Sequence, residues 1–578
     1  MRIAVIDYES CDPKVCNFLC RRMCPINRKG DECINVGIRT TGTIKKEYPF
    51  INEEMCIGCG ICINKCPKKA ISVVNTPEQR NDPVHRYGKN EFALFGLPIP
   101  VKGVVGLLGA NGTGKSTVLN ILSGKIVPNL GVVDTNEEEV NSYKELIKRE
   151  KELTDYFQKL ENGEIRSVIK PQQVDMIPKI CKGITAHFLK DVDFSIIEKL
   201  HIKNCLDRDI DKLSGGELQR VAIAAAISKD ADFYFIDEPS SYLDASERLN
   251  VAKVIRKLGQ EKSVVVVEHD LAVMDFLADR IHILYGKPTV FGIVSKPYSS
   301  RKGINSFLEG FISEENVRIR DAITFEAAQS EIKRHEILVQ FSDIEKSFEN
   351  FSMRVEKGEI YRNEVLGIFG ANALGKTTFA KILAGEIKSE GNISKQLKIS
   401  YKPQYINVDN EISVFQLLSS VDNTDFRNQI VAPLNIEKLM DKNVNELSGG
   451  ELQRVAIALC LGRDADLYLL DEPSAYLDVD QRLAIAKLIK KKTRYATCAI
   501  IDHDLMFLNY VSDRAMLFSG ISGKQGNAKF FSVKDGFNEF LKSIGVTFRK
   551  DPETKRMRAN KLDSVKDREQ KEKGEYYC

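Results

Sequence analysis

The sequence predicts an α/β protein in which two copies of a P-loop domain face each other head to tail behind a small α+β domain with clustered cysteines. Three observations predict this class: a long segment that occurs twice, a glycine-rich phosphate-binding loop in each copy, and nine of the 14 cysteines ahead of residue 67. With 578 residues, 43% of them hydrophobic and 29% charged, the chain is long enough for several domains with buried cores.

The composition excludes several classes of protein. Lys+Arg 84 and Asp+Glu 81 leave a net charge of +3, so any contact with nucleic acid needs a local patch. The sequence has no run of 18 apolar residues, and Asp7 and Glu9 interrupt the N-terminus where a signal peptide needs an apolar stretch. We therefore expect a cytoplasmic chain without a membrane span, whose clustered cysteines bind metal.

The repeated segment indicates a duplicated domain. DKLSGGELQRVAIAAAISKDADFYFIDEPSSYLDASERL aligns with NELSGGELQRVAIALCLGRDADLYLLDEPSAYLDVDQRL at an offset of 234 residues. The offset is 261 between Lys115 and Lys376 but 232 between Gln172 and Gln404, so the first copy has 29 additional residues between these motifs. We expect a domain of clustered cysteines at 1–75, the two P-loop domains at 76–298 and 336–526, and appended segments at 299–335 and 527–578.

The additional residues, around 134–163, predict a charged helical protrusion. Leu146, Leu153, Phe157 and Leu160 recur at helical spacing, and Asn162-Gly163 ends the pattern. A solvated surface helix without a partner is the alternative.

Each copy has a P-loop between a predicted strand and a predicted helix. GANGTGKS follows VVGLL, and GANALGKT follows VLGIF. Backbone N–H groups of such a loop surround the phosphates, the lysine reaches the β and γ phosphates, and the hydroxyl ligates Mg²⁺. The predicted ATP-binding residues of these loops are Gly109, Asn111, Gly112, Gly114, Lys115, Ser116 and Thr117, and Gly370, Asn372, Gly375, Lys376, Thr377 and Thr378.

A carboxylate pair ends a buried strand in each copy. FYFI leads into Asp237-Glu238, and LYLL leads into Asp471-Glu472. We expect these strands to end beside the P-loop, with the aspartate holding Mg²⁺ and the glutamate polarising the attacking water as the general base.

Two further pairs complete the predicted chemistry. His269 and His503 follow strands and are expected to contact the γ phosphate, with a satisfied core histidine as the alternative. Gln172 and Gln404, each in a KPQ tripeptide, are expected to sense the metal and the attacking water. The predicted Mg²⁺ ligands are thus Ser116, Gln172 and Asp237, and Thr377, Gln404 and Asp471.

The segment LSGGELQR predicts a second phosphate clamp in each copy, because its serine and glycines open a helix whose N-terminus attracts an anion. If the copies face head to tail, each clamp closes on the nucleotide of the other copy, and two ATP molecules join one interface. The clamp residues are Ser214, Gly215, Gly216 and Glu217, and Ser448, Gly449, Gly450 and Glu451. Together with DEPS and the D-loops at 241–244 and 475–478, these motifs resemble the nucleotide-binding domains of ABC ATPases.

The N-terminal cysteines have the spacing of two iron–sulfur sites. The second group is the bacterial ferredoxin run, in which the fourth cysteine, before a proline, ligates the other cluster. We therefore expect a ferredoxin-like domain with two 4Fe-4S clusters, and Cys33 as a buried thiol; zinc is the alternative. The ligand sets are Cys11, Cys16, Cys20 and Cys66, and Cys24, Cys56, Cys59 and Cys62.

This order of domains resembles the ABC subfamily E ribosome-recycling factors, the RNase L inhibitor family, over the whole chain. The resemblance implies that Tyr87 stacks on adenine and that the segments after each cassette are hinges. It also implies ATP hydrolysis that splits ribosomes after termination or rescue, by a monomer that binds the small ribosomal subunit and a release-factor-like protein, with initiation factors as further partners. An ATP-gated electron-transfer protein and a non-hydrolytic translation regulator are the alternatives.

Some features leave two interpretations open. The basic residues of the first domain either compensate the charge of the clusters or bind phosphate. The charged segment from Arg549 to Lys573 either binds ribosomal RNA or packs as a salt-bridged hinge. Gln173 stands where the family usually has tyrosine. Ala373 replaces a P-loop glycine, which predicts perturbed backbone angles and weaker or slower chemistry at the second site.

Overall fold

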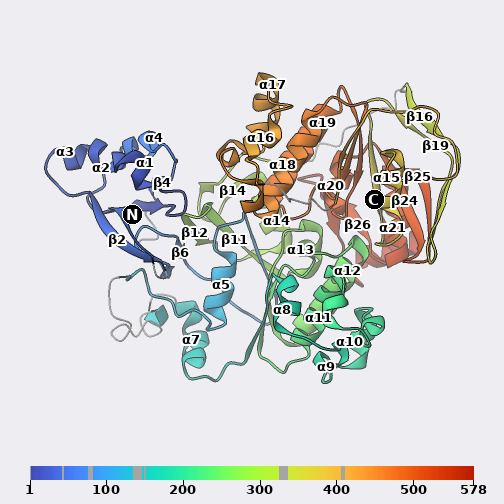
Figure 1. Ribbon diagram of the computed structural model, residues 1–578. Helices are drawn as coiled ribbons and strands as arrows, with labels where there is room; N and C mark the ends of the chain where they lie inside the picture. The colour runs from blue at the N-terminus through green and yellow to red at the C-terminus, as the bar shows by residue number, and fades with distance from the viewer. Residues whose placement is uncertain are drawn as a thin grey trace.

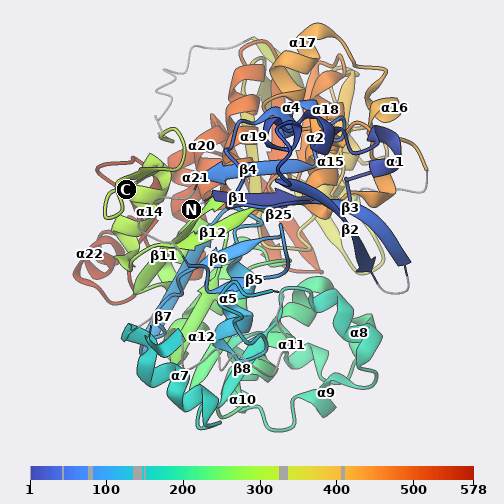
Figure 2. The same cartoon turned by 90° about the vertical axis from the view of Figure 1, so that its left-hand side faces the viewer.

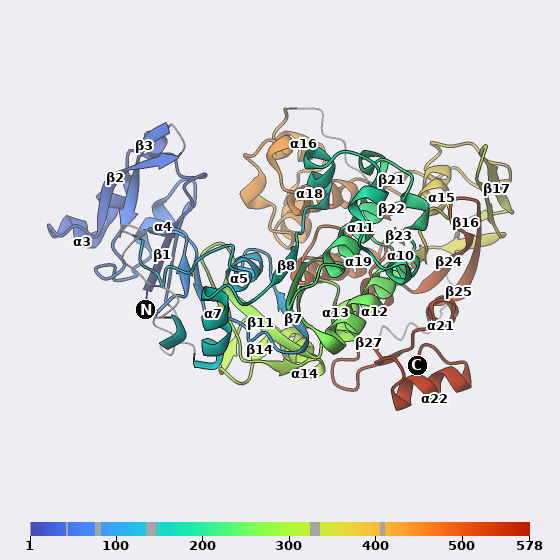
Figure 3. The ribbon, with the colours of Figure 1, turned by 90° about the horizontal axis from the view of Figure 1, so that it is seen from below.

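The computed structural model describes residues 2–41, 44–75, 82–133, 146–148, 151–323, 336–404 and 411–578. The cysteine-rich domain lies at one end, beside the first of two large α/β domains (Figures 1 and 3). This arrangement confirms the predicted fold class. In the part of the chain that the structure describes, none of the helices combines the length and the apolar character needed to cross a bilayer.

The N-terminal domain is built from two antiparallel strand pairs and short helices (Figure 2). The cysteines lie in these helices or in the loops beside them. Its core mixes aliphatic side chains with Cys20, Cys24, Cys33, Cys56 and Cys62, so the cysteines take the place of a larger apolar core. The elements are β1 (Arg2–Ile6) paired with β4 (Ile71–Asn75), β2 (Ile34–Thr41) paired with β3 (Ile44–Ile51), and helices α1 (Pro13–Cys16), α2 (Leu19–Met23), α3 (Pro25–Arg28) and α4 (Ile61–Lys65).

Each α/β domain has a mixed sheet, and the strand order is the same in both. The first sheet is ordered β5 (His85–Arg86), β6 (Ala93–Phe95), β12 (Phe291–Val294), β11 (Arg280–Lys287), β7 (Gly103–Gly109), β10 (Ser263–Val267), β9 (Phe233–Asp237), β8 (Ser167–Lys170), with β13 (Tyr298–Ser299) beside β11. The second is ordered β17 (Ile344–Ser347), β18 (Ser352–Val355), β25 (Gln525–Ser532), β24 (Arg514–Ile521), β20 (Val365–Gly370), β23 (Thr497–Ile501), β22 (Leu467–Asp471), β21 (Ile399–Lys402). The shared order confirms the duplication.

The strands that carry the motifs are parallel and buried, because helices cover both faces of such a sheet. The P-loop, clamp, D-loop and histidine segments each open a helix, so these four motifs lie at helix N-termini. These helices are α5 (Lys115–Leu122), α11 (Gly215–Ile227), α12 (Ala245–Glu261) and α13 (Leu271–Leu277) in the first half, and α15 (Lys376–Leu383), α18 (Gly449–Gly462), α19 (Val479–Lys492) and α20 (Leu505–Val511) in the second.

Smaller elements flank the two sheets. In the first half they are α7 (Thr154–Glu161), α8 (Ile177–Ile180), α9 (Thr185–Phe188) and α10 (Phe194–Lys199), followed by α14 (Ser300–Glu309), β14 (Phe311–Ile312) and β15 (Val317–Arg318). In the second half they are β16 (Ile337–Phe341), β19 (Gly358–Tyr361), α16 (Val414–Leu418) and α17 (Thr424–Phe426), followed by α21 (Val533–Ile544), β26 (Phe548–Lys550), β27 (Met557–Ala559) and α22 (Val565–Lys573).

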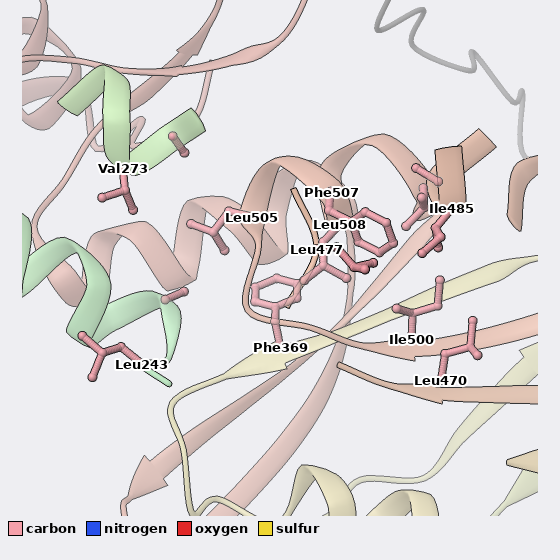
Figure 4. Close-up of a cluster of buried hydrophobic side chains, with 14 of the residues drawn as sticks. Leu243, Val273, Phe369, Leu470, Leu477, Ile485, Ile500, Leu505, Phe507 and Leu508 are labelled. Atoms are coloured by element: carbon pink, nitrogen blue, oxygen red, sulfur yellow. The ribbon is translucent and has the colours of Figure 1, made fainter. Parts of the chain in front are cut away.

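One hydrophobic core runs from one half into the other. Leu243 and Val273 of the first half belong to the same buried cluster as Phe369, Leu477 and Leu505 of the second (Figure 4). The two halves are therefore packed against each other through apolar side chains.

The structure corrects one sequence prediction and bears on a second. Strand β25 pairs with β24 from Arg514↔Ser532 onward, so the second sheet extends beyond residue 526, where the prediction ended this domain. The predicted protrusion lies partly outside the described residues, but Leu146, Leu153 and Phe157 are buried in the first core and α7 packs there. The apolar face of α7 is covered, which agrees with the helical pattern predicted there, and a protrusion of the insertion stays a prediction.

The charged C-terminal segment packs against the first half of the chain through salt bridges. Arg556 is fully buried and pairs with Asp275 of the first half at 3.0 Å, and Arg558 reaches the same carboxylate at 3.2 Å. Arg301 pairs with Asp551 at 3.1 Å. These pairs join the C-terminal segment to the first half of the chain. Because Arg556 is buried in this contact, it packs within the protein and is not exposed for binding to ribosomal RNA.

Candidate nucleotide sites and cysteine cavities

The two P-loop lysines lie inside their loops. Lys115 Nζ donates to two carbonyls of its own loop at 2.7 and 2.9 Å, and Lys376 Nζ does so at 2.9 and 2.6 Å. Burial lowers the pKa of each lysine to about 8, while nearby carboxylates oppose this shift. Phosphate oxygens offer these ammonium groups a stronger partner than backbone carbonyls do.

The predicted Mg²⁺ ligands lie in matching pairs. Ser116 Oγ is 3.1 Å from Asp237 Oδ2, and Thr377 Oγ1 is 2.8 Å from Asp471 Oδ2. Burial raises the pKa of Asp237 to about 6 and also raises that of Asp471, because charged carboxylates are poorly solvated there. Asp471 Oδ1 is buried without a hydrogen-bond partner among the described residues. Hydroxyl and carboxylate oxygens in this setting fit a Mg²⁺ ion.

Each predicted general base is held by the glutamine of the KPQ tripeptide. Gln172 Nε2 donates to Glu238 Oε1 at 2.7 Å, and Gln404 Nε2 donates to Glu472 Oε1 at 2.7 Å. Both glutamates have positive φ, +45° and +49°, which is an unfavourable conformation for a residue other than glycine. The fold therefore imposes this orientation on each base. Burial, followed by the nearby carboxylates, raises the pKa of Glu472 to about 7.

The two histidines lie next to these bases. His269 Nε2 is 3.6 Å from Glu238 Oε1, and His503 Nε2 is 3.5 Å from Glu472 Oε1. Both rings are buried, and none of their nitrogens has a hydrogen-bond partner in the described parts of the chain. Burial, followed by the positive charge of the P-loop lysine, lowers the pKa of each histidine well below 6.5. The rings are therefore neutral and are not satisfied core histidines.

Two further pairs, which were not predicted from the sequence, hold the backbone at and just before these bases. Lys170 Nζ donates to the Asp237 carbonyl at 2.9 Å, and Lys402 Nζ donates to the Asp471 carbonyl at 2.7 Å. The glutamine of the clamp motif supports the next residue, since Gln219 Nε2 donates to the Glu238 carbonyl at 2.7 Å. The sequence could have indicated these residues, because they belong to the KPQ and LSGGELQR segments that occur in both halves.

One cavity of about 1020 Å³ unites both halves. It is lined by Gln172, Glu238 and His269 with the clamp residues Ser214, Gly215 and Gly216, and by Gln404, Glu472 and His503 with Ser448, Gly449 and Gly450. Hydrogen bonds cross the interface here, because Asn111 N donates to Asp478 Oδ2 at 3.0 Å and Asn372 N donates to Asp244 Oδ2 at 2.7 Å. The halves therefore face each other as predicted.

The clamp glutamates have a structural role in addition to any contact with nucleotide. Glu217 Oε2 accepts from Ser214 N at 2.8 Å, and Glu451 Oε2 accepts from Ser448 N at 2.9 Å. Both contacts complete capping boxes that begin α11 and α18. These helices start at the serine because the box satisfies their first N–H groups, which leaves the glycine N–H groups beside the cavity.

An aromatic side chain flanks each P-loop. Tyr87 is 51% exposed, lines a cavity of about 510 Å³ with Phe92 and Lys115, and its hydroxyl lies 3.0 Å from Thr117 Oγ1. In the second half, Phe348 is 48% exposed and stacks near Phe351 at 6.3 Å, as Tyr87 lies 6.5 Å from Phe92. Phe348 is therefore the counterpart of Tyr87, which the sequence analysis missed because the spacing of the two aromatic residues differs.

The cysteines converge on two cavities. Cys11, Cys16, Cys20 and Cys66 line one, and Cys24, Cys56, Cys59 and Cys62 line the other, as predicted. All 14 cysteines are free, and Cys33 is buried beside the second set. Burial, followed by neighbouring sulfurs, raises the pKa of Cys11 to about 12, a shift that a bound cationic cluster opposes. Two groups of four sulfur ligands fit two 4Fe-4S clusters.

The cysteine-rich domain is fixed to the loop that carries Tyr87. Arg86 Nη1 donates to Glu53 Oε2 at 2.8 Å, in a pair whose side chains are 10% and 13% exposed. Asn90 is buried, with its side chain bonded to Ile51 N at 2.7 Å and to the Ala4 carbonyl at 3.1 Å. One short loop therefore contacts both the predicted adenine position and the iron–sulfur domain.

Comparison with known proteins agrees with this architecture. The ABC transporter family model matches residues 96–241 and 349–475. A model described as a possible Fer4-like domain in RNase L inhibitor matches residues 1–32, and the 4Fe-4S binding domain model matches residues 49–72. An uncharacterized ABC transporter ATP-binding protein of Methanocaldococcus jannaschii is 50% identical, with 100% of this chain and 97% of that protein covered.

Two solved structures are similar over most of the chain. A model of ribosome-bound archaeal Pelota and ABCE1 aligns with a TM-score of 0.90 and 49% identity, covering 100% of this chain and 99% of that one. The complex of the archaeal ribosomal stalk protein aP1 with the archaeal ribosome recycling factor aABCE1 aligns with a TM-score of 0.82 and 51% identity, covering 86% and 99%. The chain therefore belongs to the RNase L inhibitor family, subfamily E of the ABC ATPases, with two ATP-binding cassettes behind 4Fe-4S binding domains.

Proposed function

We propose that this protein is an ATP-driven ribosome recycling factor. Closure of the two cassettes on ATP moves the iron–sulfur domain and splits the ribosome into subunits after termination or rescue. The observation that carries the proposal is the shared cavity, which both halves line and whose hydrogen bonds cross the interface. The relative bound to a ribosome with Pelota supports a ribosomal site of action and a release-factor-like partner in the cytoplasm.

Each site uses residues of both halves. The first site uses the P-loop with Lys115, the pair Glu238 and Gln172, and the clamp that begins at Ser448. The second site uses Lys376, Glu472, Gln404 and the clamp at Ser214. Because a clamp N–H group reaches the γ phosphate only when the halves close, ATP favours the closed form and its hydrolysis releases it.

The chemistry follows from the geometry. The glutamate polarises the attacking water, the glutamine holds the glutamate in place, and the neutral histidine donates to the γ phosphate. Ser116, Asp237 and Gln172 would hold Mg²⁺ in the first site, and Thr377, Asp471 and Gln404 in the second. When bound, this ion neutralises charge on the phosphates.

The first cassette transmits its motion to the iron–sulfur domain. Arg86, Asn90 and Glu53 join this domain to the loop of Tyr87, so a shift of this loop on nucleotide binding carries the domain with it. Eight cysteines hold the two clusters, whose role here is to keep a small domain rigid enough to push against the ribosome.

Sedimentation tests the proposal. Purified archaeal ribosomes are incubated with the iron-loaded protein, ATP and a Pelota-like release factor, and 70S particles and subunits are separated on a sucrose gradient. We expect free subunits only when all components are present. The double variant Glu238→Gln, Glu472→Gln should bind ATP but stay closed and ribosome-associated, so with ribosomes in large excess it should not split them in repeated rounds. Repeated splitting by that double variant would support a non-hydrolytic binder, and intact 70S particles under all conditions contradict the proposal.

A further inference from the structure

A buried chain of polar contacts links the P-loop of each half to the histidine of the other half's site. It begins at the D-loop aspartates. Asp244 Oδ2 accepts from Asn372 N at 2.7 Å, and Asp478 Oδ2 accepts from Asn111 N at 3.0 Å. A phosphate bound in the P-loop competes for loop N–H groups and repels a carboxylate, so each aspartate is placed to respond to nucleotide in the opposite half.

The same aspartates start the next helices. The other oxygen of Asp244, Oδ1, accepts from Glu247 N at 2.9 Å and caps α12, and Asp478 Oδ1 accepts from Gln481 N at 2.9 Å and caps α19. A shift of either carboxylate therefore moves the first turn of a helix. The residue one turn further along is an arginine in both halves.

This arginine reaches the histidine segment of its own half. Arg248 Nη1 donates to Asp270 Oδ2 at 3.0 Å while its Nε donates to the Leu243 carbonyl at 2.8 Å. Arg482 repeats these contacts with Asp504 at 2.8 Å and with the Leu477 carbonyl at 2.9 Å. The two leucines are those that pack at the interface in Figure 4.

The aspartates at the far end adjoin the histidines. Asp270 Oδ1 caps α13 through Ala272 N at 2.9 Å, and Asp504 Oδ1 caps α20 through Phe507 N at 2.9 Å. His269 and His503 are the residues immediately before them. Because the arginine side chains are 13% exposed and the aspartates 4% and 5%, these ion pairs lie in a poorly solvated interior where geometry is tightly held.

We propose that Arg248 and Arg482 are positioning residues that couple the two ATP sites. Nucleotide in the second P-loop acts through Asp244, Arg248 and Asp270 on the orientation of His269 in the first site. Nucleotide in the first P-loop acts through Asp478, Arg482 and Asp504 on His503 in the second. Neither arginine is placed among the reacting groups. Because the charge of Arg248 also lowers the pKa of His503 in the second site, a change at Arg248 is tested by turnover at the first site. This inference rests on the site assignment proposed above.

Site-resolved turnover tests the coupling. Turnover at the first site is measured in two backgrounds: Glu472→Gln, in which the second site holds ATP, and Lys376→Ala, in which it is emptied. The coupling ratio is the kcat of the first background divided by that of the second, with KM recorded separately. We expect a ratio of at least tenfold in the protein with Arg248 and a ratio below twofold with Arg248→Met, while KM changes by less than twofold.

Two further variants separate positioning from folding. Asp270→Asn keeps the cap on α13 but loses the charge that holds Arg248, so it should lower the ratio as Arg248→Met does, and the double variant should lower it no further. Arg256→Met is the matched control. Arg256 lies on the same helix, bonds to the Phe276 carbonyl at 2.7 Å and is outside the chain of contacts, so it should keep the ratio of the unaltered protein.

The outcomes decide the proposal. A ratio near one in the protein with Arg248, an unchanged ratio in Arg248→Met, or an equal loss in Arg256→Met overturns it. If Arg248→Met fails to fold in a thermal melt, Asp270→Asn carries the test alone. Failure of the site assignment is a different result, because Glu238→Gln and Glu472→Gln would then leave the turnover of their own sites intact.

Discussion

The two cassettes have the same catalytic contacts but differ at the places that surround them. The glutamine-to-glutamate bond is 2.7 Å in both, and the histidine-to-glutamate distances are 3.6 and 3.5 Å. The iron–sulfur domain, in contrast, is attached through Arg86 and Asn90 to the first cassette. Both cassettes have thus kept the catalytic contacts, while the iron–sulfur domain is attached to the first cassette.

The P-loops show how such a difference is accommodated. Gly112 has φ +76° and its carbonyl accepts from Thr289 N at 2.9 Å, whereas Ala373 has φ +58° and its carbonyl accepts from Gly523 N at 2.9 Å. In the second half, the P-loop residue is alanine and the residue that bonds to its carbonyl is glycine. In the first half, the P-loop residue is glycine and the residue that bonds to its carbonyl is threonine. The backbone angles are therefore preserved, so the perturbation predicted from Ala373 does not occur. Weaker chemistry at this site stays a prediction.

The largest expected effect is the loss of turnover when either general base is replaced. Replacing Glu238 or Glu472 by glutamine removes the group that polarises the water, so turnover at that site should fall by about 10²- to 10⁴-fold. ATP binding should remain, because the P-loop N–H groups and the lysine that bind the phosphates are unchanged in these variants. Steady-state hydrolysis and filter binding of labelled ATP measure both quantities. Rapid turnover in the double variant contradicts the assignment, and unequal losses in the single variants show which cassette dominates.

The next effect concerns the attachment of the iron–sulfur domain. Arg86→Met leaves Glu53 buried without its partner, which should weaken docking of this domain by about 3 kcal/mol. Hydrogen exchange of β1 and β4 in the iron-loaded protein measures this. Arg354→Met is the control in the second cassette, since Arg354 pairs with Asp343 at 3.2 Å on the surface, and it should have no measurable effect. Equal protection in both variants would show that this pair does not hold the domain.

A pH series tests whether both histidines are neutral and buried. Their pKa values lie well below 6.5, so folding gains stability above pH 6.5 that it loses as the pH falls below this value, where the unfolded chain binds protons. Each histidine should cost about 1.4 kcal/mol per pH unit below about pH 6.5. The raised pKa values of Glu472 and Asp237 act in the opposite direction in this range, so each variant is compared with the unaltered protein. In urea unfolding at pH 7.5, 6.5 and 5.5, His269→Gln or His503→Gln should each remove about 1.4 kcal/mol per pH unit of the stability lost below about pH 6.5. A slope unaffected by either substitution disproves the burial argument.

The smallest expected effect is the loss of stability when the first P-loop is given the alanine of the second. Gly112→Ala places a Cβ about 3.2 Å from Thr289 N, in a conformation that disfavours side chains, and should destabilise the protein by about 1 kcal/mol. Adding Thr289→Gly, which copies the second half, should restore the loss. Urea unfolding measures both, and failure of the second substitution to restore stability refutes the compensation.

The ATP affinities of the two sites should also differ. Lys115→Ala removes the P-loop lysine of the first site and Lys376→Ala removes that of the second, so the affinity that remains in each variant is that of the other site. We expect Lys115→Ala to bind ATP more weakly than Lys376→Ala, because the weaker site is in the second cassette.

Motifs with a fixed backbone requirement could be predicted from the sequence. The P-loops and the strand-ending carboxylates lie where predicted, because each forms within one strand–loop–helix unit. The two cysteine sets also lie where predicted, because each consists of three cysteines of one short run and the cysteine before proline of the other run. The boundary at residue 526 was wrong because β25 joins the sheet through pairing with β24, which no local pattern marks. The helix of the insertion was predicted because its apolar residues recur at helical spacing, and those residues are the ones that pack in the core.

The sequence by itself determined the chemistry: two phosphate-binding cassettes, their bases and eight cluster ligands, since these depend on residue types at short spacings. Only the tertiary structure identified Phe348 as the counterpart of Tyr87 in the second half. It alone also decided how the parts join, namely that Asp244 and Asp478 contact the opposite P-loops and that Arg556 is buried against Asp275. Such contacts join residues hundreds of positions apart, and their partners are selected by the packing of whole domains.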